Sequence, residues 1–209
     1  MAITYQPFGL RQNRQLFGAA GNFQANIRTI KKGYATAIGF GDPVITLQGT
    51  NAGYIGPYTE GGTRILGVLI GILPYFDTVL QTYVNKNWWA GTESPSGDVQ
   101  AFVVDDISQS FLIQVNGGPV TQASVGLNAD IGGGGAPSTT GSNGSIGLST
   151  AYLDYTTVGT ASTLPLRIIG ISTLAWGGTD PTVPTSQLVA NNIVEVRLNT
   201  SEFLQQAGV

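Results

Sequence analysis

Apolar and polar residues alternate along much of the chain in short runs, a pattern that predicts β-strands. From residue 36 onward, runs rich in Thr, Val, Ile, Tyr and Phe are separated by Gly, Asn and Pro at the spacing of hairpin turns. In the run SFLIQV, Phe111, Ile113 and Val115 fall on one face of a strand, and the Asn-Gly pair that follows supplies a turn. The strands predicted in this way cover residues 36–40, 44–48, 64–73, 77–84, 100–106, 110–115, 121–127, 145–154, 164–174 and 193–199.

Helical periodicity is nearly absent. The best candidate, TSQLVANN at residues 185–192, is a single short segment. Short strands without intervening helices pack as two-layered or closed sheets, in which alternation buries one face. We therefore predict an all-β protein, an antiparallel β-sandwich or barrel that is jelly-roll-like.

The sequence also suggests how the chain is divided. Residues 1–35 show no sustained period and predict an extended N-terminal arm, whereas residues 36–209 predict a single β-rich body. Within that body, residues 129–147 (ADIGGGGAPSTTGSNGSIG) predict a long exposed loop, because successive glycines lose much backbone freedom in a strand.

Charge is distributed unevenly between these parts. The chain has a net charge of -3, with nine basic and twelve acidic residues, yet five basic residues precede the first acid, Asp42. Such an arm would bind an acidic surface of a partner, and the alternative is a solvated basic edge beside an acidic body. We expect that neutralising the five charges leaves the body folded. The candidate partner-binding residues of the arm are Arg11, Arg14, Arg28, Lys31 and Lys32, together with Phe8, Phe17 and Phe23.

The composition removes most catalytic chemistry. The chain has no cysteine and no histidine, so it has no thiol nucleophile, no Ser-His-Asp triad, no imidazole base and none of the usual zinc sites. The acids Asp105 and Asp106 could in principle serve a glycosidase with Glu60 or Glu93, or bind calcium with Asp98, but turn-capping explains them better. We expect no catalytic residue, no metal and no cofactor.

Two classes of partner are also not expected. Five positive charges in front of an acidic body would bind nucleic acid weakly at physiological salt. The longest apolar stretch, at residues 64–73, is about half as long as a membrane-spanning helix. The sequence therefore predicts neither a nucleic-acid partner nor a membrane.

The three tryptophans lie in segments that resemble loops. Trp88 and Trp89 occur in VNKNWWAG, and Trp176 occurs in TLAWGG. Exposed tryptophans anchor subunit interfaces or stack on sugar rings, and buried ones pack in the core. Trp88, Trp89 and Trp176 are thus candidates for a subunit interface or a glycan site, with core packing as the alternative.

Several phrases in the sequence resemble a known group of proteins. AFVVDDISQSFLIQVNG, SVGLNADIGGGG, STAYLDYTT, LPLRIIG and NNIVEVRLNTS, all within residues 100–201, are similar to small structural proteins encoded beside the major capsid protein of tailed bacteriophages, especially short-tailed phages of cyanobacteria and marine bacteria. Members of that group resemble capsid decoration, or cement, proteins. These are β-rich and often trimeric subunits that sit on the outer shell and clamp neighbouring capsomers.

The resemblance implies a function that agrees with the composition. It implies a non-enzymatic virion protein on the outer capsid surface, assembled in the host cytoplasm, whose partners are the major capsid protein and further copies of itself, as a homotrimer. Two alternatives remain open. The first is a head-fibre base or host-glycan-binding virion protein, and the second is a glycoside-active β-sandwich enzyme.

Overall fold

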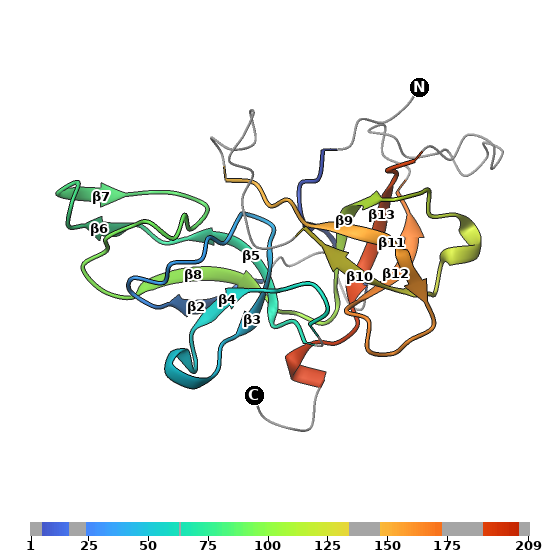
Figure 1. Cartoon of the computed structure of the whole chain (residues 1–209), viewed down its shortest axis with the longest axis horizontal. Helices are drawn as coiled ribbons and strands as arrows, with labels where there is room; N and C mark the ends of the chain where they lie inside the picture. The colour runs from blue at the N-terminus through green and yellow to red at the C-terminus, as the bar shows by residue number, and fades with distance from the viewer. Residues whose placement is uncertain (1–5, 17–23, 63, 134–146, 173–189, 205–209) are drawn as a thin grey trace.

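The regular secondary structure of the described residues is almost entirely β-strand, as the sequence predicts. The computed structural model describes residues 6–16, 24–62, 64–133, 147–172 and 190–204 (Figure 1). Its helical segments are short 3₁₀ turns, namely η1 (Gly49–Asn51), η2 (Gln122–Ser124) and η5 (Glu202–Leu204). Within these residues no helix has the length and apolar character needed to span a membrane.

Five strands close into a small barrel, which is one of the two architectures predicted. They lie in the order β9-β11-β10-β12-β13, and β13 pairs back to β9. Neighbours are antiparallel except β9 and β11, which are parallel. A sixth strand, β1, pairs with β9 beside β11. The bounds are β1 (Arg11–Gln15), β9 (Gln109–Asn116), β10 (Asn128–Gly132), β11 (Tyr152–Gly159), β12 (Leu166–Ile171) and β13 (Ile193–Leu198).

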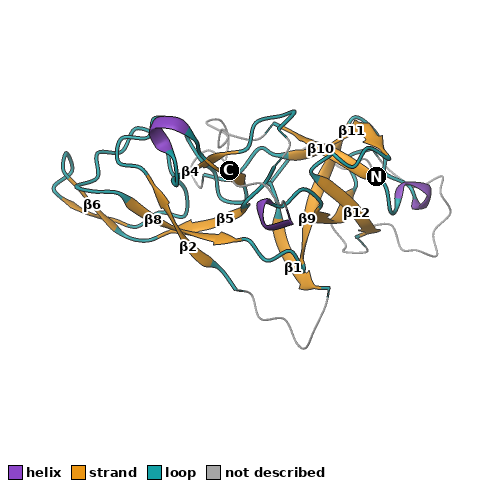
Figure 2. Cartoon of the chain, turned by 90° about the horizontal axis from the view of Figure 1, so that it is seen from below, coloured by secondary structure: helices purple, strands orange, loops and turns teal. Residues whose placement is uncertain are grey.

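A second, antiparallel sheet lies beside the barrel (Figures 1 and 2). It has five strands in the order β2-β8-β5-β3-β4, and the separate hairpin β6–β7 lies at its far end, away from the barrel (Figure 1). The bounds are β2 (Asn26–Ile30), β3 (Pro43–Thr46), β4 (Ile55–Pro57), β5 (Gly67–Ile72), β6 (Tyr75–Asp77), β7 (Thr82–Val84) and β8 (Val99–Val104).

Strand alternation builds the two hydrophobic clusters. Phe111 and Ile113 of β9 point into the barrel, and Val99 and Ala101 of β8 belong to the cluster of the second sheet. Val68 of β5, like Val104 of β8, packs in the barrel cluster although its strand belongs to the second sheet. The two sheets are therefore joined through a shared hydrophobic contact.

The prediction of a separate N-terminal arm is corrected by the structure. β1 pairs with β9 and β2 pairs with β8, so both segments belong to the sheets. Leu10 and Ile30, which adjoin or end these strands, are fully buried. The arm was inferred because residues 1–35 show no sustained period. The period is missing because β1 and β2 lie at sheet edges, where few side chains reach the core.

The first part of the predicted glycine-rich loop is a strand and not a loop. Ala129, Asp130, Ile131 and Gly132 belong to β10, and Ala129 and Ile131 are core residues of the barrel. Residues 134–146 of the predicted loop lie outside the described residues.

Candidate functional site: an arginine face on the barrel

Two arginines from the C-terminal half of the chain lie side by side on the outside of the barrel. Ile168 and Val196 are opposite each other and point into the barrel core, so the residues that precede and follow them point outward. Arg167 of β12 and Arg197 of β13 are therefore outside, and they are directly opposite one another in the register of the two strands. The barrel brings together two cations that are far apart in the sequence.

Strand β1 adds two more arginines to this side of the barrel. Glu195, next to Arg197 on the outer face, pairs with Leu112 of β9, and Leu112 pairs with Arg11. Arg14 reaches the same Glu195 with both ends of its guanidinium group. We call this surface the arginine face, and its members are Arg11, Arg14, Arg167 and Arg197.

Glu195 is the carboxylate that binds Arg14 on this face. Its Oε1 accepts hydrogen bonds from Arg14 Nε at 2.7 Å and from Ser110 Oγ at 2.6 Å, and its Oε2 accepts one from Arg14 Nη2 at 2.9 Å. Burial alone would raise the pKa of Glu195, but the hydrogen bonds from Arg14 and Ser110 and the charge of Arg14 outweigh burial, so the pKa lies below its ordinary value. The same pairing raises the pKa of Arg14.

We expect Glu195→Gln to reduce the loss of stability that acid causes. Because the native pKa of Glu195 is lowered, its stabilising contribution is present above the ordinary value of 4.5 and is lost as the pH falls through the native value. Urea unfolding between neutral pH and about pH 3 measures the free energy of unfolding. The values for wild type and variant should become more similar as the pH falls. Glu60→Gln, at an exposed position, is the matched control. A constant difference in the free energy of unfolding between wild type and Glu195→Gln over this pH range would contradict the expectation.

Arg11 is held by aromatic rings. Its guanidinium carbon lies 4.6 Å from the ring centroid of Phe40 and 6.0 Å from that of Phe8. Burial lowers the pKa of Arg11 from its ordinary value, but an arginine stays charged at neutral pH. Phe8, one of the predicted partner-binding residues, is half-buried and lies against Arg11.

Arg167 and Arg197 differ from Arg14 because neither has an ion pair or a side-chain hydrogen bond among the described residues. The Nε of Arg197 is buried and has no hydrogen-bond partner there. Like charges that face each other across two strands repel, and a buried donor without a partner costs free energy. An external carboxylate can bind the accessible N–H groups of these two arginines, since a guanidinium group binds a carboxylate with two parallel hydrogen bonds, although it cannot reach the buried Nε of Arg197.

The other three basic residues of the predicted arm lie on the second sheet and not on the arginine face. Arg28 Nη2 pairs with Asp105 Oδ2 at 2.5 Å, and its guanidinium carbon lies 5.6 Å from the ring centroid of Phe203. Lys31 Nζ donates to the carbonyl of Thr50 at 3.0 Å. The Nζ of Lys32 donates to the carbonyl of Ser96 at 3.2 Å. The structure therefore divides the five predicted basic residues between two surfaces.

The expectation that all five charges could be neutralised without harm to the fold is also corrected. Arg14 and Arg28 are paired with Glu195 and Asp105, whose side chains are only 10% and 5% exposed. Removing either arginine leaves a buried carboxylate without its cation, which destabilises a fold. The sequence could not reveal these pairs because their members are far apart along the chain.

Trp89 is a core residue, so its assignment to a subunit interface or a glycan site is wrong. It is fully buried in the cluster of the second sheet, its Nε1 donates to the carbonyl of Tyr34 at 2.8 Å, and its ring centroid lies 6.1 Å from that of Tyr75. Trp88 is half-buried, and its ring covers Gly147, which has a positive φ and no room for a side chain. Trp176, Phe17 and Phe23 lie outside the described residues.

The candidate carboxylates hold local structure. Asp106 Oδ1 accepts hydrogen bonds from the backbone N–H and the hydroxyl of Ser108, both at 2.7 Å, which is the turn-capping role expected from the sequence. Glu93 Oε1 accepts a hydrogen bond from the backbone N–H of Ala90 at 2.7 Å. Among the described residues, no three acidic side chains gather in a way that could hold a metal ion.

Comparisons with known proteins give no relative. No family model, no curated protein sequence and no solved structure is significantly similar to this chain. Function is therefore argued from the chain's own surfaces.

Arg167 and Arg197 were not among the candidate residues from the sequence. The sequence does indicate that both side chains point outward, because in LPLRIIG and IVEVRLN each arginine occupies a polar position between apolar neighbours. Alternation predicts that each points outward, but only the pairing of β12 with β13 puts the two opposite each other.

Proposed function

We propose that the protein is a non-enzymatic structural protein of a virion that binds the outer surface of an assembled phage capsid and stabilises it by bridging capsomers. The observation that carries the proposal is the arginine face, where β1, β12 and β13 bring four arginines to one side of the barrel and only one of them, Arg14, is paired with a carboxylate, that of Glu195. The sequence resemblance to decoration proteins supplies the identity of the partner.

An acidic protein surface suits the arginine face better than nucleic acid does. Two of its arginines already contact protein groups, since Arg14 binds Glu195 and Arg11 stacks on Phe40. Arg167 and Arg197 remain available for carboxylates. The whole chain is acidic, with a net charge of -3, so it would be repelled by a phosphate backbone outside this small face.

Self-association is part of the same proposal. Ile27 of β2 and Phe102 of β8 are cross-strand neighbours on the outer face of the second sheet and are 54% and 37% exposed. Exposed apolar neighbours of this kind favour contact with another protein surface. We propose that copies associate as a homotrimer on the shell, the state that the resemblance implies.

The test of shell binding uses the two arginines that have no internal partner. The double variant Arg167→Gln and Arg197→Gln should fold as well as wild type, because it removes a like-charge pair and leaves no carboxylate unpaired. Its affinity for shells assembled from the major capsid protein should fall about tenfold or more, which corresponds to a loss of roughly 1.4 kcal/mol. The salt dependence of binding should also be weaker than that of wild type.

The matched control removes two charges from the other sheet. In the variant Lys31→Gln and Lys32→Gln, the arginine face is intact, so shell binding should stay close to wild type. Co-sedimentation with shells at low and high salt measures all three proteins. Equal binding by wild type and the double arginine variant at every salt concentration would refute the assignment of the arginine face.

A further inference from the structure

The hairpin β6–β7 presents two aromatic rings on one side. Phe76 and Tyr83 are paired across the two strands, with ring centroids 5.5 Å apart and ring planes at 73°. Tyr83 is 74% exposed. On the other side of the hairpin, Tyr75 belongs to the cluster of the second sheet and Val84 packs against that cluster, so the aromatic side is held in a fixed orientation.

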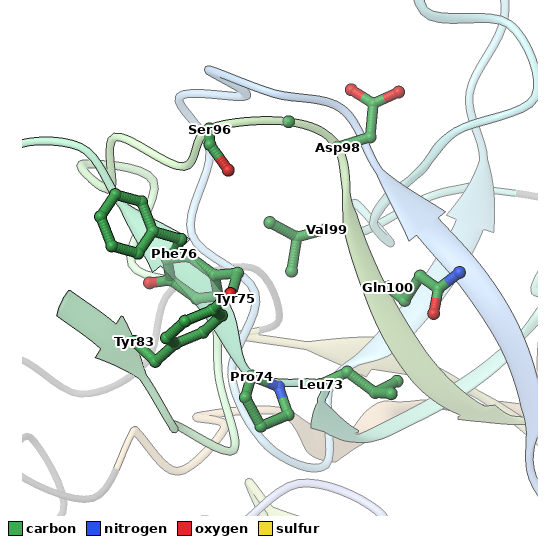
Figure 3. A pocket seen from close by; sticks show the side chains of 10 residues that line it. Leu73, Pro74, Tyr75, Phe76, Tyr83, Ser96, Asp98, Val99 and Gln100 are labelled. Atoms are coloured by element: carbon green, nitrogen blue, oxygen red, sulfur yellow. The ribbon is translucent and has the colours of Figure 1, made fainter. Parts of the chain in front are cut away.

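An open groove of about 290 Å³ lies beside these rings (Figure 3). Phe76 and Tyr83 form one wall, to which the largely buried Tyr75 also contributes, Leu73 and Pro74 lie at one end, and residues 96–100 form the other wall (Figure 3). The volume is close to the lower end of the range for small-molecule sites. The groove is thus suited to a single small unit and not to a large cofactor.

No ionised group points into the groove. Its lining contains no lysine or arginine. Asp98 contributes to the lining, but its side chain points away from the rings (Figure 3), and its two oxygens accept hydrogen bonds from the backbone N–H of Lys32 at 2.8 Å and from the Tyr54 hydroxyl at 3.0 Å. The hydroxyl of Ser96 lies on the side of the groove that faces the rings (Figure 3).

This combination restricts the class of ligand. The aromatic rings can pack against an apolar surface, and the hydroxyl of Ser96 and the side-chain amide of Gln100 can form hydrogen bonds. Because no charged group points into the groove, neither an anion nor a cation is favoured as its ligand. We infer that the groove binds a neutral carbohydrate, with one sugar ring packed on Tyr83 and its hydroxyl groups directed to the wall of residues 96–98.

The position of the groove allows this binding to occur on a shell-bound protein. The β6–β7 hairpin lies at one end of the molecule and the barrel lies at the other (Figure 1). A capsid contact through the arginine face would leave the hairpin free. The inference does not depend on the proposed shell binding, because it concerns different residues.

The test uses the full chain and a defined panel of sugars. Maltotetraose, cellotetraose, chitotetraose and mannotetraose are the neutral probes, and sialyllactose and tetragalacturonate are the acidic ones. Isothermal titration and saturation-transfer NMR should detect binding of at least one neutral probe. Tyr83→Ala should lower its affinity about tenfold or more, and Tyr83→Phe, which keeps the ring, should retain it.

A tyrosine elsewhere on the surface provides the control. Tyr155, on strand β11 of the barrel, is also exposed, so Tyr155→Ala should bind the sugar as wild type does. Circular dichroism and thermal unfolding establish that each variant is folded. Absence of binding to every neutral probe, preference for the acidic probes, or full binding by Tyr83→Ala would each overturn the inference, whatever the outcome of the shell-binding test.

Discussion

Replacing Trp89 with alanine is expected to lower the free energy of unfolding by about 3–5 kcal/mol, the range for large-to-small substitutions of buried aromatic residues. Trp89 is fully buried among the apolar residues of the second sheet, and its indole N–H holds the backbone at Tyr34. The substitution removes both the packing and that hydrogen bond. Equilibrium urea unfolding, followed by circular dichroism, measures the change.

The adjacent tryptophan is the matched control. Trp88 is half-buried and covers Gly147, so Trp88→Ala should cost clearly less than Trp89→Ala. Quenching of fluorescence by iodide should also distinguish Trp88 from Trp89, because Trp88 is partly exposed to solvent and Trp89 is fully buried. Equal losses of stability in the two variants would show that Trp89 is not the core residue described above.

Arg28→Met is the second substitution with a large expected effect, a loss of about 2–3 kcal/mol. Arg28 neutralises Asp105, whose side chain is only 5% exposed and whose other hydrogen bond in the structure comes from Asn26 Nδ2 at 2.6 Å. Methionine fills much of the space of the aliphatic part of the arginine side chain, but it leaves the carboxylate of Asp105 without a cation. Urea unfolding at neutral pH gives the free energy.

A double-mutant cycle separates loss of charge pairing from loss of packing. Adding Asp105→Asn to Arg28→Met removes the unpaired carboxylate, so the double variant should recover more than half of the loss. Asp105→Asn alone should cost less than Arg28→Met, because the arginine side chain is 33% exposed and can be solvated. Additive effects of the two substitutions would mean that the ion pair does not account for the loss.

The strands of the core could be predicted from the sequence because their alternation is local. The predicted strand at residues 110–115 lies within β9, and the one at 193–199 nearly coincides with β13. The edge strands β1 and β2 were missed, since hardly any of their side chains are fully buried and their sequences show no apolar period. Closure of the barrel was not predictable either, because nothing local specifies that β13 pairs with β9.

The candidate site was predicted only in part, and the reason is again pairing. Arg11 and Arg14 were chosen for their position in a basic N-terminal segment, and the structure joins them to Arg167 and Arg197 through the register of four strands. Trp88 and Trp89 had the same local context, although one is half-buried and the other belongs to the core. Neighbouring residues that point to opposite sides cannot be distinguished without knowing which side faces the core.

The return of β13 to β9 has a consequence for synthesis of the protein on the ribosome. Strand β9 ends at Asn116, but β13, the strand that closes the barrel on it, begins only at Ile193. Until then, the edge of β9 that pairs with β13 and the inward-facing residues Phe111 and Ile113 have no final cover. Closure of the barrel therefore has to wait until β13 has been made, and the pairing of such distant segments is slow compared with the formation of local contacts.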